Sequence, residues 1–372
     1  MKPVKIIHIT DLHQRHSARL FYSTGKKINN GFVKNGHNVI NISDRDLTNQ
    51  SKNIFDISGR KILFREIIKN IENFKPDLII FGHVDRLDEE SFYNIKEKYN
   101  SIRLAQWFID PLNIYGPDYE KNKQRFFLKY QFCDANFITT ATDVLDFVDE
   151  KKTFFIPNPI DPSIDIYKSF LNEKEIDIFL AISHGQHRGI LKRDFIDDRV
   201  YFINKLTKKA KYNIFGYKNN PVWGHNFFLE LNKCSMGINL SRGQPIKYYS
   251  SDRISSLLGN GLLTFIHEDY NYSDFFKKKS IVTYKNINDL NKKILFFKKN
   301  KKLLKEYAKN SHARAHKIFN NQIIAEYIIN TPGNIKMRNV TDEENLHRRN
   351  YRQADNIDYL DGDLKSSISY QD

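Results

Sequence analysis

The amino-acid sequence predicts an α/β protein made of two doubly wound domains. Strand-like and helix-like segments alternate along most of the chain, a proline-rich segment interrupts this series, and 372 residues exceed what one hydrophobic core usually organises. Alternation of this kind is typical of a parallel sheet with helices on both faces. We therefore expect two sheets, with a cleft between the domains that carry them.

The first domain is expected over residues 1–160. Its strands are short apolar runs, predicted at 5–9, 38–42, 77–81, 102–107, 135–139 and 154–156. Helical patterns are predicted at 25–35, 59–73 and 120–130. The segment 157–162 then contains three prolines, which can continue neither a central strand nor a helix interior, so we place the domain boundary there.

The second domain is expected over residues 161–335. Its strands are predicted at 176–181, 212–216, 236–240, 262–266 and 281–284. A helical segment follows from 290 to 330, and the run Thr331-Pro332-Gly333 is expected to end it. Residues 336–372 are polar and show almost no periodicity, so we expect a weakly ordered tail.

The composition argues against several classes of protein. Hydrophobic residues make up 40% and charged residues 28%, and no run reaches the ~18 apolar residues of a membrane-spanning helix. Residues 1–7 pass directly into a strand-like run without the pattern of a signal peptide, so we expect a cytoplasmic location. Cys133 and Cys234 lie far apart in apolar surroundings, which indicates two reduced thiols. We expect neither a metal nor a cofactor.

A net charge of +15 suits three kinds of partner: nucleic acid, anionic lipid or a phosphorylated small molecule. Much of the excess is lysine in runs such as 277–279 and 298–302, which we expect on solvated helix faces. No recognised nucleic-acid-binding module occurs, so no nucleic acid partner is expected, although a basic, non-enzymatic nucleic-acid-binding protein remains an alternative. The basic surface also suits peripheral contact with the anionic inner face of a membrane.

Three consecutive motifs in the second domain resemble one family. They are Ser235-Met-Gly-Ile-Asn-Leu-Ser-Arg-Gly243, Ser251-Asp-Arg-Ile254 and Leu257-Leu-Gly-Asn-Gly-Leu-Leu263. This block is similar to the spore-maturation-protein-like group of GT-B glycosyltransferases. In that group a later helix carries His and Arg, as His312, Arg314 and His316 do here, and the first domain carries an aromatic and Asp-Pro motif like residues 107–111.

The resemblance covers residues 1–330 and implies a function. It implies the GT-B fold, in which two Rossmann-like domains face each other across the substrate cleft. It also implies transfer of a hexosyl or related sugar from a nucleotide-sugar donor to a glycan, lipid-linked or surface-polysaccharide acceptor. The sequence departs from the group at Ser256, where an acidic residue usually follows the helix arginine by three positions. Either Asp252 or Glu268 is expected to supply the carboxylate from a nearby position, or the donor is held differently.

The chemistry of the donor explains the residue types expected around it. The departing diphosphate gains negative charge, so cations and free N–H groups at strand ends and helix starts lower the barrier. Arg253 and Lys247 are the leading cations. The predicted donor-binding residues are His184, Gly185, Lys192, Ser241, Arg242, Gly243, Lys247, Ser251, Asp252, Arg253 and Glu268.

A general base for the acceptor hydroxyl is expected from the first domain. Asp11 and His13 follow the first strand, and Asp110 follows the strand that contains Trp107. Parallel sheets bind ligands at these carboxyl ends, so the three are the predicted catalytic residues. Capping of a turn or helix is the alternative role for each.

A second resemblance gives a competing function. Residues 9–13, Ile-Thr-Asp-Leu-His, are similar to the first metal motif of calcineurin-like metallophosphoesterases, in which Asp11 and His13 would bind a catalytic metal. Such enzymes need further ligands from several Gly-Asp, Gly-Asn-His and Gly-His motifs. The nearest approach is Phe-Gly-His-Val-Asp at 81–85. This reading stays an alternative, which metal-dependent phosphodiester hydrolysis would support.

Overall fold

The computed structural model describes residues 2–116, 118–182, 198–217, 219–249 and 251–337. Its first sheet has six parallel strands in the order β2-β1-β3-β4-β5-β6. Their bounds are β1 Lys5–Ile9, β2 Asn38–Ile42, β3 Leu78–Phe81, β4 Arg103–Phe108, β5 Ala135–Ile138 and β6 Thr153–Phe155. The strand order changes direction between β1 and β3, which makes the carboxyl ends of these two strands the expected place for a ligand.

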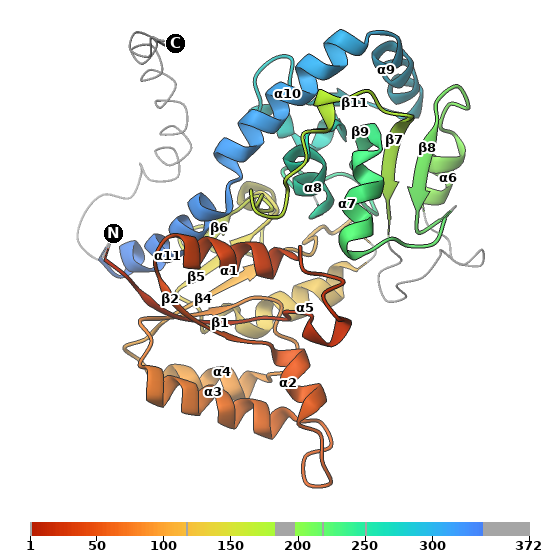
Figure 1. Ribbon diagram of the computed structural model, residues 1–372. Coiled ribbons are helices and arrows are strands. Elements are labelled where there is room, and N and C mark those ends of the chain that lie inside the picture. Colours follow the sequence, from red (N-terminus) through yellow and green to blue (C-terminus); the bar gives the residue numbers. More distant parts are fainter. Residues whose placement is uncertain (1, 117, 183–197, 218, 250, 338–372) are drawn as a thin grey trace, which may run out of the picture. The chain divides into compact units, whose positions relative to one another are not determined.

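Helices cover both faces of this sheet because alternate strand residues point to opposite sides (Figure 1). The helices are α1 Thr24–Lys34, α2 Asp44–Gln50, α3 Arg60–Phe74, α4 Glu89–Lys98 and α5 Tyr119–Tyr130. Ile7 and Ile9 of β1 belong to a core cluster with residues of α3 and α4. His8, between them, meets Phe32 of α1 on the opposite face at 5.6 Å between ring centroids.

The second sheet has five parallel strands in the order β11-β10-β9-β7-β8. Their bounds are β7 Ile176–Ala181, β8 Tyr212–Phe215, β9 Cys234–Ile238, β10 Leu263–His267 and β11 Val282–Tyr284. Here the order changes direction between β7 and β9. The helices α6 Asp198–Asn204, α7 Gly224–Asn232 and α8 Arg253–Gly259 connect these strands.

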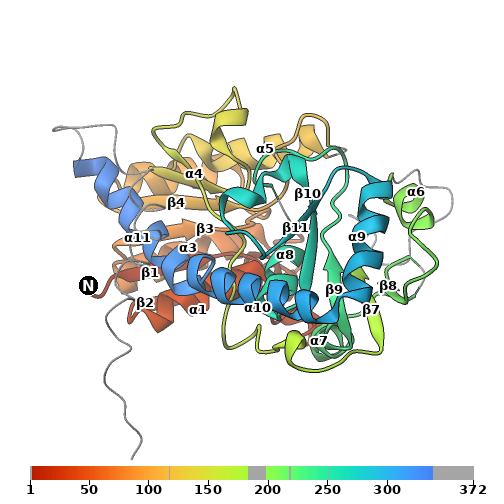
Figure 2. The same ribbon diagram turned by 90° about the horizontal axis from the view of Figure 1, so that it is seen from above.

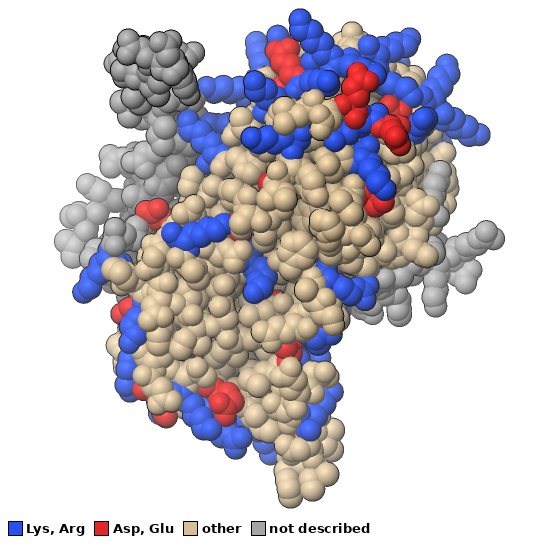
Figure 3. Space-filling view, in the orientation of Figure 1, with Lys and Arg blue, Asp and Glu red and all other residues tan. Residues whose placement is uncertain are grey.

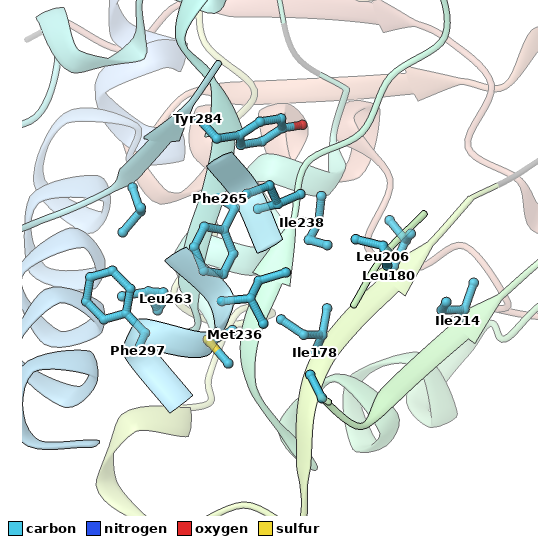
Figure 4. Packing of buried hydrophobic residues seen from close by; sticks show 14 of the residues in the cluster. Ile178, Leu180, Leu206, Ile214, Met236, Ile238, Leu263, Phe265, Tyr284 and Phe297 are labelled. Atoms are coloured by element: carbon cyan, nitrogen blue, oxygen red, sulfur yellow. The ribbon is translucent and has the colours of Figure 1, made fainter. Parts of the chain in front are cut away.

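The core of the second domain forms on both faces of its sheet. Alternate residues of β7 separate the two sides. Ile178 and Leu180 pack with α9 and α10 (Figure 4). Phe179, on the other face, packs with α7 and α8. Both predicted sheets are therefore present, and the predicted class, two doubly wound α/β domains, is confirmed.

The helical segment predicted from 290 to 330 is three helices, α9 Ile287–Lys299, α10 Lys301–Ile318 and α11 Asn321–Met337. The expected stop at residues 331–333 is wrong, because α11 passes through them. No helix within the described ranges is long and apolar enough to cross a membrane. Residues 338–372, most of the predicted tail, lie outside the described part of the chain.

The chain returns to the first sheet through α11 (Figure 2). Tyr327 of α11 contacts Phe137 of β5 at 5.7 Å between ring centroids. Just before α11, the N–H of Ile160 donates to Phe319 and the N–H of Asn321 donates to Ile160. The two crossings between the domains therefore run side by side. The domain limits of 160/161 and 335/336 stay a prediction.

Candidate functional site

The carboxyl ends of β7 and β9 meet at the point where the order of the second sheet changes direction. Arg253, the first residue of α8, lies across these ends. Its Nε donates to the carbonyl of Ala181 at 2.6 Å, and its Nη1 donates to the carbonyl of Leu240 at 2.9 Å. The guanidinium is thus fixed at the place where doubly wound sheets bind ligands.

The electrostatic surroundings of Arg253 favour an incoming anion. Burial lowers the pKa of Arg253 to about 10, and the like charge of Arg199 acts in the same direction. Asp252 opposes this shift, as do the buried tyrosines Tyr249 and Tyr270. The side chain stays charged at pH 7, so a phosphate placed here would meet a cation that is largely out of water.

A pocket of about 150 Å³ opens beside Arg253. Its walls are mostly apolar and aromatic, formed by Leu20, Tyr22, Ala181, Ile182, Phe215, Pro221, Val222, Trp223 and Phe227, and its polar side is Asp252, Arg253 and Ser256. Tyr22 comes from the loop after β1 and stacks on Phe227 at 5.1 Å with 12° between the ring planes. Both domains therefore contribute to this pocket.

Ser256 lies in the pocket wall, although the resembling group has an acidic residue at this position. Asp252 lies in the same wall, one residue before Arg253, and is exposed. Glu268, the other proposed source of a carboxylate, follows β10 and does not line the pocket. Of the two candidates, Asp252 is therefore the one placed beside Arg253.

The segment from Ser241 to Tyr249 joins the second domain to the first. Arg242 forms an ion pair with Asp118, and Lys247 forms one with Asp143. These predicted donor-binding cations therefore contact carboxylates of the first domain. Between them, Nδ2 of Asn113 donates to the carbonyl of Gln244 at 2.6 Å.

The remaining predicted donor residues are distributed around this segment. Gly243 has a φ of +74°, a conformation that glycine adopts easily, and its N–H donates to Asp198 at 3.2 Å. Ser241 follows β9 within the same segment, and Ser251 comes directly before Asp252. His184, Gly185 and Lys192 lie outside the described residues.

In the first domain, Asp11 is buried and held by arginines. Both of its oxygens accept from Arg15, at 2.7 and 2.8 Å, and Arg45 lies 3.4 Å away. Burial disfavours its charge, but the hydrogen bonds from Arg15 and the nearby His13 hold the pKa of Asp11 below its ordinary value. His13 lies 3.2 Å from Asp11 in a left-handed turn with φ of +60°. Asp11 is thus buried and surrounded by two arginines, which leaves little of its carboxylate open to an incoming hydroxyl.

Asp110 lies in a second part of the same charge network. Its Oδ2 accepts from Arg125 at 2.5 Å, and Arg125 also contacts Asp85 at 2.9 Å. Its side chain is 36% exposed, against 3% for Asp11. Of the two predicted catalytic carboxylates, Asp110 is therefore the more exposed to solvent.

The network also argues against the metallophosphoesterase alternative. Arg45 bridges Asp11 and Asp85, so a guanidinium occupies the space between the two carboxylates that a metal would need. Burial lowers the pKa of His83 to about 4, and its ring stacks against Trp107 and Phe108. Within the described ranges, no three His, Cys, Asp or Glu side chains gather as a metal site requires.

Several residues at these sites were not predicted. Arg15, Arg45 and Arg125 hold the carboxylates of the first domain, and Trp223 lines the pocket. Trp223 is one of only two tryptophans in the chain, which is a signal in the sequence. The arginines gave no such signal, because charged residues on helices are usually solvated.

The histidines of α10 act within the second domain. His316 contacts the carbonyl of Gly259 at 2.8 Å, and Arg314 donates to the carbonyl of Phe275 at 3.1 Å. The rings of His312 and His316 lie 4.2 Å apart between centroids and are tilted by 43°. These contacts hold α10 against α8 and the loop after β10.

Cys133 and Cys234 are both buried, and neither forms a disulfide bond.

Residues 199–330 match a family model described as glycosyl transferase-like. This segment contains α8, Arg253 and most of the pocket. A search of curated protein sequences gives no significant match.

Solved structures with similar folds include proteins in complex with UDP or UDP-glucose. HepE from Anabaena, in complex with UDP-glucose, shows 12% identity and a TM-score of 0.57 over 89% of this chain and 100% of its own. TarM of S. aureus shows 14% sequence identity and a TM-score of 0.54. The match covers 74% of this chain and 58% of TarM, so this chain spans little more than half of TarM. A Listeria monocytogenes protein described as a UDP-N-acetylglucosamine 2-epimerase shows 12% sequence identity and a TM-score of 0.51. The match covers 92% of this chain and 99% of that protein.

These similarities define a class. The protein has the GT-B fold of two Rossmann-like domains, and the predicted resemblance to GT-B glycosyltransferases is confirmed. At such low identities the structures show the fold alone, and a fold can serve several activities.

Proposed function

We propose that this protein is a glycosyltransferase that moves a hexosyl or related sugar from a nucleotide sugar to a glycan, lipid-linked or surface-polysaccharide acceptor. One observation carries the proposal: Arg253 is fixed across the carboxyl ends of β7 and β9, beside a pocket with aromatic walls. The family match over residues 199–330 supports transfer over the other activities of this fold.

The diphosphate and the nucleoside of a nucleotide sugar each have a partner in this arrangement. In the proposal, the diphosphate lies against Arg253, with Arg199 adding positive potential. The nucleoside enters the pocket, where Trp223 and Phe227 offer apolar faces and Asp252 offers a carboxylate to the ribose hydroxyls. Negative charge that develops on the leaving diphosphate is then stabilised by a cation already in position.

The acceptor is proposed to bind at the carboxyl edge of the first sheet. Asp110 is exposed enough there to accept a proton from an acceptor hydroxyl, and Arg125 orients it. Asp11 and His13 then belong to the ionic framework behind it. The proposal also includes a cytoplasmic location with peripheral contact to anionic membrane, supported by the net charge of +15.

The proposal is tested by thermal shift with UDP, other nucleoside diphosphates and their sugar conjugates. A ligand that binds only the folded state raises its stability, by about 2.7 kcal/mol at a concentration of 100 times Kd. In Arg253→Ala the Kd for the preferred nucleotide should rise about tenfold or more, because charge-assisted bonds to phosphate contribute about 1.5–3 kcal/mol each. Absence of a shift with every nucleotide would contradict the proposal.

Two further variants separate binding from folding. Arg253→Ala also loses two bonds to carbonyls, so its own stability should fall. Trp223→Ala leaves those bonds intact and should weaken nucleotide binding but leave pyrophosphate binding unchanged. Lys302→Ala removes an exposed cation of α10 and should change neither nucleotide binding nor pyrophosphate binding.

Product analysis separates transfer from epimerisation. A transferase forms a new glycoside and releases the nucleotide only when an acceptor is supplied. An epimerase changes UDP-N-acetylglucosamine without any acceptor. Conversion of the donor sugar in the absence of acceptor would favour the epimerase reading of the fold.

A further inference from the structure

Three large apolar side chains project into solvent from the loop between α2 and α3. Ile54, Phe55 and Ile57 are 84%, 86% and 80% exposed. We call residues 52–58 the apolar tip. Figure 1 shows this loop extending away from the first domain beyond the ends of both helices. Exposure of three neighbouring side chains of this size is unfavourable in water, so it indicates an interaction surface.

The apolar tip is held in one conformation by its own hydrogen bonds. Oδ1 of Asn53 accepts from the N–H groups of Phe55 and Asp56, at 2.9 and 3.0 Å. The carboxylate of Asp56 accepts from Ser58 at 3.0 Å and from the N–H of Ile62 at 3.0 Å. The turn thus presents its apolar side chains outward before any partner arrives, which reduces the entropy lost on binding.

Gly59 fixes the base of the apolar tip. It has a φ of +71°, and a Cβ at this position would lie 2.3 Å from the carbonyl oxygen of Thr48. The loop therefore approaches the end of α2 more closely than any other residue would allow. This contact keeps the apolar tip directed away from the domain.

The charges around the apolar tip are positive. Lys52, Arg60 and Lys61 are exposed, whereas the carboxylate of Asp56 is only 7% exposed within the turn. Figure 3 shows an uncharged end at the bottom of the first domain with Lys and Arg around its base. An apolar end with exposed cations at its base is complementary to a bilayer that carries anionic headgroups.

We propose that the apolar tip inserts into the interface of an anionic membrane, with Lys52, Arg60 and Lys61 at the headgroups. A tip-to-tip pairing with a second copy of the chain fits less well. Each copy would bury on the order of 500 Å², against about 800 Å² per partner in a standard interface, and the exposed cations of the two copies would face each other. A membrane requires no matching surface. This inference names the surface for the membrane contact in the proposed function and does not depend on the donor site.

The position of the apolar tip connects the membrane to the acceptor edge. The first turn of α2 carries Arg45 and Asp46, which belong to the charge network around Asp11. The seven residues of α2 span only about 10 Å before the loop begins. Insertion of the apolar tip would therefore hold the acceptor edge near the bilayer, where a lipid-linked acceptor has its sugar.

Vesicle binding of the full chain tests the inference. We expect binding to vesicles that contain phosphatidylglycerol, little binding to pure phosphatidylcholine, and weaker binding as salt rises. A variant with Ile54→Ser, Phe55→Ser and Ile57→Ser should bind anionic vesicles about tenfold or more weakly, because it loses most of the inserted apolar surface. Its nucleotide thermal shift should equal that of the parent.

A matched control is Phe296→Ser on α9. Phe296 is 49% exposed and followed by Lys298 and Lys299, but it lies on a helix face rather than at the end of a projection. This control should bind vesicles as the parent does. Equal binding by the parent and the triple Ser variant would overturn the inference, as would loss of binding in the control alone.

A fluorescent probe reports insertion directly. Phe55→Trp should show a blue shift and quenching by brominated lipid on anionic vesicles, and Phe296→Trp should not. Sedimentation of the lipid-free protein distinguishes self-association. If the parent forms dimers that the triple Ser variant loses, and neither binds vesicles, the apolar tip is a protein interface and the inference is wrong.

Discussion

Asp44 is a buried carboxyl group at the start of α2, next to the charge network of the first domain. Burial raises its pKa to about 6. The N–H of Asp85 donates to it at 3.0 Å and favours its charge, as does Arg45, whereas Asp11 opposes it. The folded state therefore binds a proton that the unfolded chain releases between pH 4 and pH 6.

This shift predicts how stability depends on pH. Because the folded pKa lies above the unfolded value, the contribution of Asp44 is most favourable below about pH 4 and is lost as pH rises through 6. Asp44→Asn removes this loss and should stabilise the protein by about 1–2 kcal/mol at pH 7.5, since one pKa unit corresponds to 1.36 kcal/mol. Urea unfolding of the variant and the parent at pH 7.5 and at pH 4.5 checks this prediction. An equal difference in their free energies of unfolding at the two pH values would contradict it.

At the residue scale, the sequence indicated which side chains lie at strand ends but not what holds them. In the sequence, Asp11 and Asp110 each follow a predicted strand, and in the structure both lie at the carboxyl edge of the first sheet. Arg15 lies only four residues after Asp11, but its position in a 3-10 turn gives no helical or strand periodicity that would pair the two. Arg45 comes from α2 and Arg125 from α5, and only folding brings them to these carboxylates.

At the scale of elements, strands were predicted better than helix ends. The runs 5–9 and 176–181 match β1 and β7, because buried parallel strands are rich in apolar residues. The run 38–42 also matches β2, an edge strand in which only Ile42 is buried. The long helical pattern from 290 to 330 concealed a break at Asn300, where neither glycine nor proline marks an end. There, Nδ2 of Asn300 donates to the carbonyl of Phe296, so a side chain replaces the usual signal.

Gly31 of α1 decides how closely this helix meets the start of α11. A Cβ at Gly31 would lie 2.2 Å from the carbonyl oxygen of Asn321. Alanine in a helix usually stabilises by about 0.5–1 kcal/mol relative to glycine, but here the backbone must move. We expect Gly31→Ala to lower stability by about 1–3 kcal/mol in urea unfolding. Val33→Ala, at a half-exposed position of the same helix, should be neutral or stabilising. Similar free energies of unfolding for the Gly31→Ala and Val33→Ala variants would contradict the close approach of α1 and α11 as the cause.

At the scale of the whole molecule, the two domains share a buried ionic junction. Lys27 of α1 pairs with Asp165 of the connecting segment at 2.6 Å, and the two side chains are 2% and 0% exposed. Asp165 also accepts from Asn260, which ends α8 in the second domain. The proline-rich segment predicted the crossing between domains, but the pairing across 138 residues could not be predicted.

Removing one partner of this junction should destabilise both domains together. Burial raises the pKa of Asp165, whereas Lys27 favours its charge. Lys27→Met leaves Asp165 buried without its cation, and breaking buried pairs in this way costs about 3–5 kcal/mol. Lys27→Met with Asp165→Asn should recover part of that loss, because no lone charge stays buried. Urea unfolding is followed by the fluorescence of Trp107 and Trp223, one in each domain. The Lys27→Met variant should show one transition, at a lower urea midpoint than the parent. A decrease of less than about 1 kcal/mol in its free energy of unfolding would show that the pair does not join the domains.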